Sequence, residues 1–236
     1  MNRPSHPMTP NTAFIRMVVS VLVGTLLTAA MIFIAAGRFD WPLAWLFVLA
    51  WGLFKLVFAI LLRWRSPELM VERATRHANT QPYDRWIIPI YFVLAFATVG
   101  IAGLDGGRFG WSGEMPLAVV IIAYIIYLLG TFLAAWAVDA NAFFSSESRL
   151  QTDRQQTVSR NGPYRFVRHP GYLAAVILWP ATGPMLKSWW AVLPGLLAAL
   201  TMFIRTVYED RILQAELPGY KEYTQQVRYR LFPGIW

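Results

Sequence analysis

Long apolar stretches separated by short polar segments dominate the pattern along the 236 residues of this chain. A helix of about 20 residues crosses a hydrocarbon core of about 30 Å, and most of the stretches reach that length. Glycine, proline or charged residues bound each of them, as is typical of membrane-spanning helices. The pattern predicts an all-α, polytopic transmembrane helical bundle with about six spans. The stretches are residues 14–36, 41–62, 86–104, 116–138, 171–186 and 189–205.

The last two stretches are separated only by Lys187 and Ser188, which predicts an antiparallel helical hairpin. At about 1.5 Å per residue, the stretch 171–186 is short for a full crossing. We expect it to tilt little or to turn back before the far surface.

The distribution of apolar and polar segments divides the chain into three parts. Residues 1–13 are proline-rich and polar, which predicts a flexible N-terminal tail. Residues 14–140 hold the first four spans, and the first of them is too long for the core of a usual signal peptide, so we expect it to be retained. Residues 141–236 form a C-terminal region that contains the hairpin.

Two further elements are expected in the C-terminal region. Residues 141–160 place Phe143, Phe144 and Leu150 among polar residues, which predicts an interfacial helix. After the break at Pro218 and Gly219, a short amphipathic helix is expected to pack under the hairpin as a cytosolic cap.

Composition supports the membrane assignment and excludes several kinds of site. With 56% hydrophobic and only 14% charged residues, the chain is too apolar for an ordinary soluble domain. The chain has no cysteine, which excludes disulfides and thiolate sites, and its three histidines lie far apart, so we expect no metal. The net charge of +8 comes from residues scattered over loops rather than from one basic stripe, so we expect no nucleic-acid partner.

Lysine and arginine concentrate in alternate loops. One side of the predicted bundle holds only Arg38, Arg108 and Lys187, while Lys55 lies inside a span. Because basic residues stay in the cytosol, the richer side predicts that both termini and the two long loops are cytosolic. We expect a multi-pass protein of the bacterial inner membrane. The richer side consists of Arg3, Arg16, Arg63, Arg65, Arg73, Arg76, Arg85, Arg149, Arg154, Arg160, Arg165, Arg168, Arg205, Arg211, Lys221, Arg228 and Arg230.

Two polar motifs flank the predicted hairpin. NGPYRFVRHPGY, residues 161–172, precedes its first helix, and RTVYEDRIL, residues 205–213, ends its second. Pro170 suits the first position of a helix, whose free amides would attract an anion. The hairpin should therefore bring together Arg168, His169, Tyr172, Arg205, Glu209 and Asp210.

These motifs, with the hairpin between them, resemble the isoprenylcysteine carboxyl methyltransferase family, whose wider group includes the phospholipid methyltransferases. The resemblance covers residues 141–236 and makes them the catalytic region. It implies S-adenosylmethionine as cofactor, in a cytosol-facing pocket that the acceptor enters from the lipid. The family usually has two adjacent glutamates where this chain has Glu209 and Asp210. Position by position, the resemblance and the charged cluster suggest cofactor contacts from Tyr164, Arg168, His169, Pro170, Tyr172, Glu209 and Asp210.

We therefore expect an integral membrane methyltransferase that uses S-adenosylmethionine. Its acceptor would be lipophilic or small, with a carboxylate, amine or thiol to be methylated. Arg205 and Glu209 are the predicted catalytic residues, with Arg205 orienting the acceptor through charge-assisted hydrogen bonds. The alternative for this pair is a plain helix ion pair. Lys55 is interpreted as a snorkelling residue, with a place in the acceptor cavity as the alternative.

Two other functions stay open at this stage. The first is a nicotinamide-dependent membrane reductase, because sterol reductases resemble this family in their C-terminal half. The second is a non-catalytic lipid-binding membrane protein that kept the fold. Cofactor binding discriminates among the three.

Overall fold

The computed structural model of the protein describes residues 8–75, 77 and 79–236, and within this part of the chain every regular element is a helix. The all-α prediction is confirmed. The α-helices are α1 (Pro10–Ala36), α2 (Pro42–Arg65), α3 (Pro67–Ala74), α4 (Asp84–Ala102), α5 (Leu117–Asp139), α6 (Pro170–Met185), α7 (Val192–Glu216) and α8 (Tyr220–Gln226). A π-helical segment, η1 (Gly103–Phe109), and two 3₁₀ turns, η2 (Thr152–Arg154) and η3 (Gly162–Arg165), complete them.

Five of the helical segments are long and apolar enough to cross a membrane: α1, α2, α4 continued by η1, α5 and α7. Helix α6 has 16 residues, about 24 Å at 1.5 Å per residue, which is less than the hydrocarbon thickness. The short first arm expected for the hairpin is therefore present. Helix α7 continues to Glu216, well past the predicted end at Arg205, so its last turns carry polar side chains beyond the apolar stretch.

The start of α1 differs from the expected 13-residue tail. Most of that tail, residues 1–7, lies outside the described residues. Helix α1 already begins at Pro10, because the Thr9 side chain accepts a hydrogen bond from the amide of Thr12 and proline suits the first helical turn.

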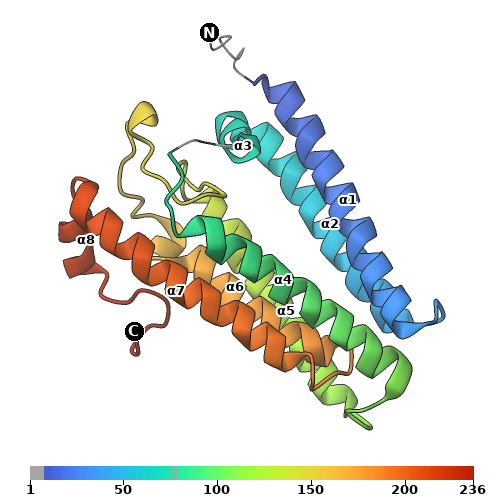
Figure 1. The fold of residues 1–236 in the computed structure, drawn as a ribbon. Helices are drawn as coiled ribbons and strands as arrows, with labels where there is room; N and C mark the ends of the chain where they lie inside the picture. The colour runs from blue at the N-terminus through green and yellow to red at the C-terminus, as the bar shows by residue number, and fades with distance from the viewer. Residues whose placement is uncertain (1–7, 76, 78) are drawn as a thin grey trace.

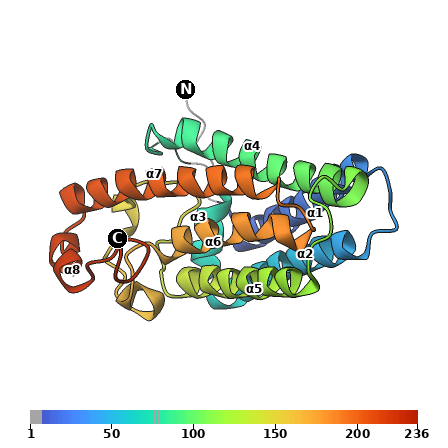
Figure 2. The ribbon, with the colours of Figure 1, turned by 90° about the horizontal axis from the view of Figure 1, so that it is seen from below.

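The helices form two groups (Figure 1). Helices α4, α7, α6 and α5 lie side by side in this order, as Figure 2 shows. Helices α1 and α2 pair with each other and meet the first group at the end far from α3, where Ile32, Phe47 and Met185 belong to one buried core. At the α3 end the two groups diverge, and there the loops and α8 gather (Figure 1).

The hairpin of α6 and α7 depends on close backbone contact. A Cβ atom on Gly195 would lie 2.6 Å from the carbonyl oxygen of Trp179, so only glycine permits this approach. At the hairpin turn, the Ser188 hydroxyl donates to the buried Asp105 carboxylate at 2.6 Å. This bond fastens the turn to η1 and fixes how the two arms lie against α4.

Residues 141–160 do not form the predicted interfacial helix. Their only helical part is the 3₁₀ turn η2. Side chains compete for the backbone here: Asn141 accepts from the Phe143 amide at 2.9 Å, and Gln156 accepts from the Gln151 amide at 2.8 Å. The segment is instead an irregular cover that contributes side chains to the site described next. The predicted short helix after Gly219 is present as α8.

Candidate functional site

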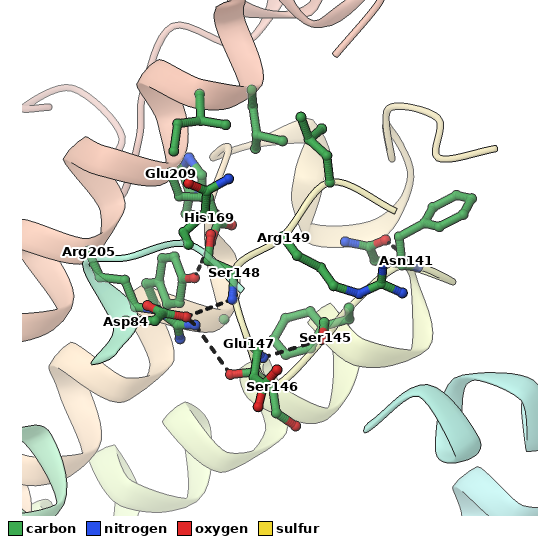
Figure 3. A pocket seen from close by; sticks show the side chains of 18 of the residues that line it. Asp84, Asn141, Ser145, Ser146, Glu147, Ser148, Arg149, His169, Arg205 and Glu209 are labelled. Carbon is green, nitrogen blue, oxygen red and sulfur yellow. Dashed lines mark hydrogen bonds and ion pairs between the residues drawn. The ribbon is translucent and has the colours of Figure 1, made fainter. Parts of the chain in front are cut away.

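A cavity of about 800 Å³ lies at the loop-rich end of the bundle. Its walls come from α3, α4, α6, α7 and α8 and from the irregular segment after α5 (Figure 3). The volume is in the range of small-molecule sites, which is about 300–1,000 Å³. Polar and aromatic side chains share the lining, so the cavity suits a ligand with both characters.

Most of the predicted site residues line this cavity. Pro170 and Asp210 are not among the lining residues. Those that line it are Tyr164, Arg168, His169, Tyr172, Arg205 and Glu209. The two sequence motifs therefore do meet, although not all of their members face the same space.

His169 is held in place from three sides. It immediately precedes α6, and its side chain is buried. Its Nε2 atom lies 3.3 Å from Asp210 Oδ1 and 3.3 Å from the Tyr220 hydroxyl, and its ring stacks on Tyr172. Its Nδ1 atom lies 3.8 Å from Glu209 Oε1, on the cavity side. The imidazole is thus fixed while one nitrogen remains near the cavity carboxylate.

Asp210 is fully buried, and both oxygens of its carboxylate accept hydrogen bonds from other side chains of the protein. Arg230 Nε and Gln214 Nε2 donate to Oδ2 at 2.9 and 2.7 Å, and the Tyr220 hydroxyl donates to Oδ1 at 3.1 Å. Arg168 Nε lies 3.2 Å from Oδ1 as an ion pair. The cofactor contact expected of Asp210 does not match this geometry, because a saturated carboxylate away from the cavity supports its neighbours instead.

Glu209 is the carboxylate that faces the cavity. It accepts a hydrogen bond from the Tyr172 hydroxyl at 2.5 Å, and 22% of its side chain is exposed. Its second oxygen has room for a ligand donor. Adjacent acids on one helix thus point in different directions, Glu209 into the cavity and Asp210 into the protein.

Arg205 forms a buried ion pair that the sequence did not reveal. Its Nε and Nη2 atoms donate to Asp84 of α4 at 2.8 and 2.7 Å, and its guanidinium lies over the Tyr172 ring. No Arg205–Glu209 ion pair occurs among the described residues, although the helical spacing allowed one. Nη2 also donates to the Ser146 carbonyl at 3.2 Å, so Arg205 lines the cavity with three of its N–H donors already engaged (Figure 3).

The start of α6 is not the open anion site that its sequence suggested. The Arg168 and His169 amides donate to the carbonyls of Tyr229 and Arg230 at 2.9 and 3.0 Å. These bonds fix the residues just before α6, and the Tyr172 and Leu173 amides of its first turn both donate to the His169 carbonyl at 3.1 Å. Pro170 itself has no amide hydrogen to offer.

Buried tyrosines form another part of the cavity wall. The Tyr164 hydroxyl accepts from Asn141 at 3.1 Å, and the Tyr223 hydroxyl donates to the Tyr164 carbonyl at 2.7 Å. Burial raises the pKa of both phenols above their ordinary value, so both remain neutral donors at physiological pH. Tyr220 and Tyr223 belong to the short helix that was expected only to cap the hairpin, and both line the cavity.

Comparison with known proteins gives one family. Residues 118–217 match the family model described as phospholipid methyltransferase. No match was found among curated proteins. The matched segment runs from the first turn of α5 to the residue after α7, so it contains both motifs and Glu209, whereas Asp84 and α8 lie outside it.

Proposed function

This chain carries a domain of the phospholipid methyltransferase family of integral membrane methyltransferases, and we propose that it is an enzyme. It would use S-adenosylmethionine to methylate a lipophilic or small acceptor. One observation carries the proposal. His169 and Glu209, both within the matched domain, lie together on the wall of a cavity of suitable size.

The chemistry of the lining fits the cofactor. S-adenosylmethionine supplies an activated methyl group on a sulfonium, and it also carries ribose hydroxyls and an aromatic base. Glu209 has a carboxylate oxygen available to hydroxyl donors, and such charge-assisted bonds are strong. The rings of Tyr164 and Tyr172 offer aromatic faces to the base or to the cation.

The remaining side chains hold this arrangement rigid. Asp210 and Tyr220 act through His169 and are positioning residues. Methyl transfer is an in-line displacement, so alignment of donor and acceptor is the main contribution a protein can make. Arg205, fixed by Asp84, contributes a cation beside the place where the acceptor's carboxylate, amine or thiol would be oriented.

The acceptor would enter from the bilayer beside α4. Ile88, Pro89 and Phe92 line the cavity, and 53% of Phe92 is exposed on the outside of the bundle. A hydrocarbon chain can therefore lie against α4 while its reactive group is inside. The lysines and arginines of the basic loops would keep this end of the bundle, and both termini, on the cytosolic side. The membrane would be a bacterial inner membrane.

Cofactor binding by the full-length protein in lipid nanodiscs tests the proposal. S-adenosylmethionine should bind, and His169→Ala or Glu209→Ala should weaken binding at least about tenfold, since each removes a group of the lining. Glu216→Ala, an exposed acid later on α7, is the matched control.

Other outcomes lead elsewhere. Binding of reduced nicotinamide dinucleotide instead would indicate a membrane reductase, and binding of neither compound would indicate a lipid-binding protein. Mass spectrometry of membranes with and without the protein then identifies the acceptor as the species that gains one methyl group.

A further inference from the structure

Arg73, on α3, is a cation on the cavity wall with an incomplete set of partners. Its Nη1 atom donates to the Phe144 carbonyl at 3.2 Å, and its guanidinium lies over the Phe144 ring at 5.4 Å. Its Nε atom is buried and has no hydrogen-bond partner among the described residues. In the same part of the chain, no acidic side chain forms an ion pair with it.

The fully buried arginines of the cavity all have carboxylate partners. Arg149 pairs with Glu72, Arg168 with Asp210 and Arg205 with Asp84. The protein thus neutralises each of these cations internally. Arg73, which is partly buried, differs from them in having no such partner among the described residues, although Glu72 is its neighbour on the same helix.

The charge on Arg73 is retained despite this. Burial lowers the pKa of Arg73 to about 10, which still leaves it a cation at neutral pH. A desolvated cation without a counter-ion is costly, because its lost hydration is not replaced. An anion bound there would remove that cost.

The surroundings of Arg73 connect it to the proposed transfer site. Phe144, under the guanidinium, packs against Gly171 in the first turn of α6, one residue before Tyr172. Lys55 of the adjacent helix α2 is exposed, with its ammonium over the Trp51 ring.

Resting on the proposed function, we infer that Arg73 is a specificity-determining residue that binds an anionic group, a phosphate or a carboxylate, on an amphiphilic acceptor. This group is not the one that reacts. It anchors the acceptor at the lipid side of the cavity, so that its chain remains in the bilayer and its reactive end reaches His169 and Glu209. The cavity of about 800 Å³ has room for this headgroup beside a cofactor.

The cofactor's own carboxylate is the other possible source of such an anion. The place of Arg73 in the chain favours the acceptor's anionic group over the cofactor's carboxylate. Arg73 belongs to α3, outside residues 118–217, whereas the proposed cofactor contacts from the two motifs lie inside that domain. Helix α3 directly follows α2, which is one of the membrane spans. The experiment separates the two sources by measuring lipid and cofactor binding independently.

Native mass spectrometry of the purified full-length protein measures the lipid preference with two probe pairs. The first is dioleoyl phosphatidic acid against dioleoylglycerol, and the second is oleic acid against oleyl alcohol. The wild type should prefer at least one anionic member about tenfold or more, as charge-assisted bonds to one arginine allow. Arg73→Gln should abolish the preference and Arg73→Lys should retain part of it. Arg65→Gln, an exposed arginine paired with Asp139 at the same end, should change nothing.

S-adenosylmethionine affinity, measured on the same variants, gives the second readout. It should be unchanged in Arg73→Gln. The inference is overturned if the wild type shows no anion preference, if Arg73→Gln keeps it, or if Arg73→Gln weakens only cofactor binding. An anion preference that depends on Arg73 in a protein that binds no S-adenosylmethionine would uphold the lipid subsite and reject the methyltransferase.

Discussion

Arg205 of α7 and Asp84 of α4 form a two-pronged ion pair across the floor of the cavity, with N–O distances of 2.8 and 2.7 Å. Both side chains are buried. The Ser148 amide donates to the same carboxylate at 2.7 Å, so the irregular segment is fixed at this point as well. A residue outside the matched methyltransferase domain thus determines where one of the predicted catalytic residues lies.

Asp84→Asn should lower the free energy of unfolding by about 3–5 kcal/mol, because it leaves a buried guanidinium without a counter-ion. Thermal unfolding in detergent measures the change. Asp139→Asn is the matched control, since its partner Arg65 is exposed and such pairs contribute about 1 kcal/mol or less. Equal effects of the two substitutions would show that the Asp84 pair is not a stabilising contact.

Glu209→Gln should reduce S-adenosylmethionine affinity about 10- to 100-fold with little change in stability, because it removes a charged acceptor that faces the cavity. Tyr172→Phe should have a smaller effect, since it removes only the bond that orients this carboxylate. Calorimetric titration of both variants checks the order. A larger loss in Tyr172→Phe would mean that the tyrosine, rather than Glu209, carries the binding.

The buried tyrosines predict a loss of stability at alkaline pH. Burial raises the pKa of Tyr223 in the folded protein, so folding favours the protonated phenol. Stability is then complete below the unfolded-state pKa of about 10 and falls as the pH rises above it. Tyr223→Phe should cost about 1 kcal/mol at neutral pH, where it loses its bond to Tyr164, and should flatten the alkaline fall. Melting temperatures between pH 8 and 11.5 test both parts, and an unchanged slope would contradict the second.

Gly195→Ala should destabilise the hairpin by about 1–3 kcal/mol, because the new methyl group would meet the Trp179 backbone at 2.6 Å. Gly100→Ala on α4 is the control. Its methyl group would lie 3.4 Å from the flexible Met31 side chain, and alanine favours the helix by about 0.5–1 kcal/mol. Thermal unfolding should therefore shift in opposite directions, and a stable Gly195→Ala protein would refute the close contact.

Arg149→Gln should loosen the irregular cover of the cavity. Arg149 holds residues of this cover to α3 through Glu72 at 2.9 Å, and also pairs with Asp153. Without the charge, amides of residues 145–151 should exchange hydrogen faster, which mass spectrometry detects peptide by peptide. Arg165→Gln, on an exposed side chain, should leave these peptides unchanged.

The membrane helices could be predicted from the sequence because each long apolar stretch is a local signal. The bounds of the hairpin differ from the prediction mainly where α7 continues into polar residues. The irregular structure of residues 141–160 was not predicted, because side-chain hydrogen bonds such as that from the Phe143 amide to Asn141 replace helical ones. Pattern alone does not reveal which side chains block a helix.

The site could be predicted in part for a related reason. The motifs at the hairpin ends were found because an antiparallel hairpin brings its two ends together, as for His169 and Glu209. The Asp84–Arg205 pair joins residues 121 positions apart, and only the packing of α4 on α7 makes it. The available signal was an acid just before the third apolar stretch. Because that acid pairs with Arg205, the alternative ion pair between Arg205 and Glu209 within α7 does not occur among the described residues.

The carbonyls of Tyr229 and Arg230, which accept the amides at the start of α6, have a consequence for how the protein is made. Every helix around the cavity is synthesised before this segment. The bundle can therefore be inserted in the membrane while the pocket is still unfinished. Its support depends on a stretch that the ribosome reaches only after all the spans, so premature termination near Val227 would leave an inserted protein in which Arg168, His169 and Asp210 lack these partners.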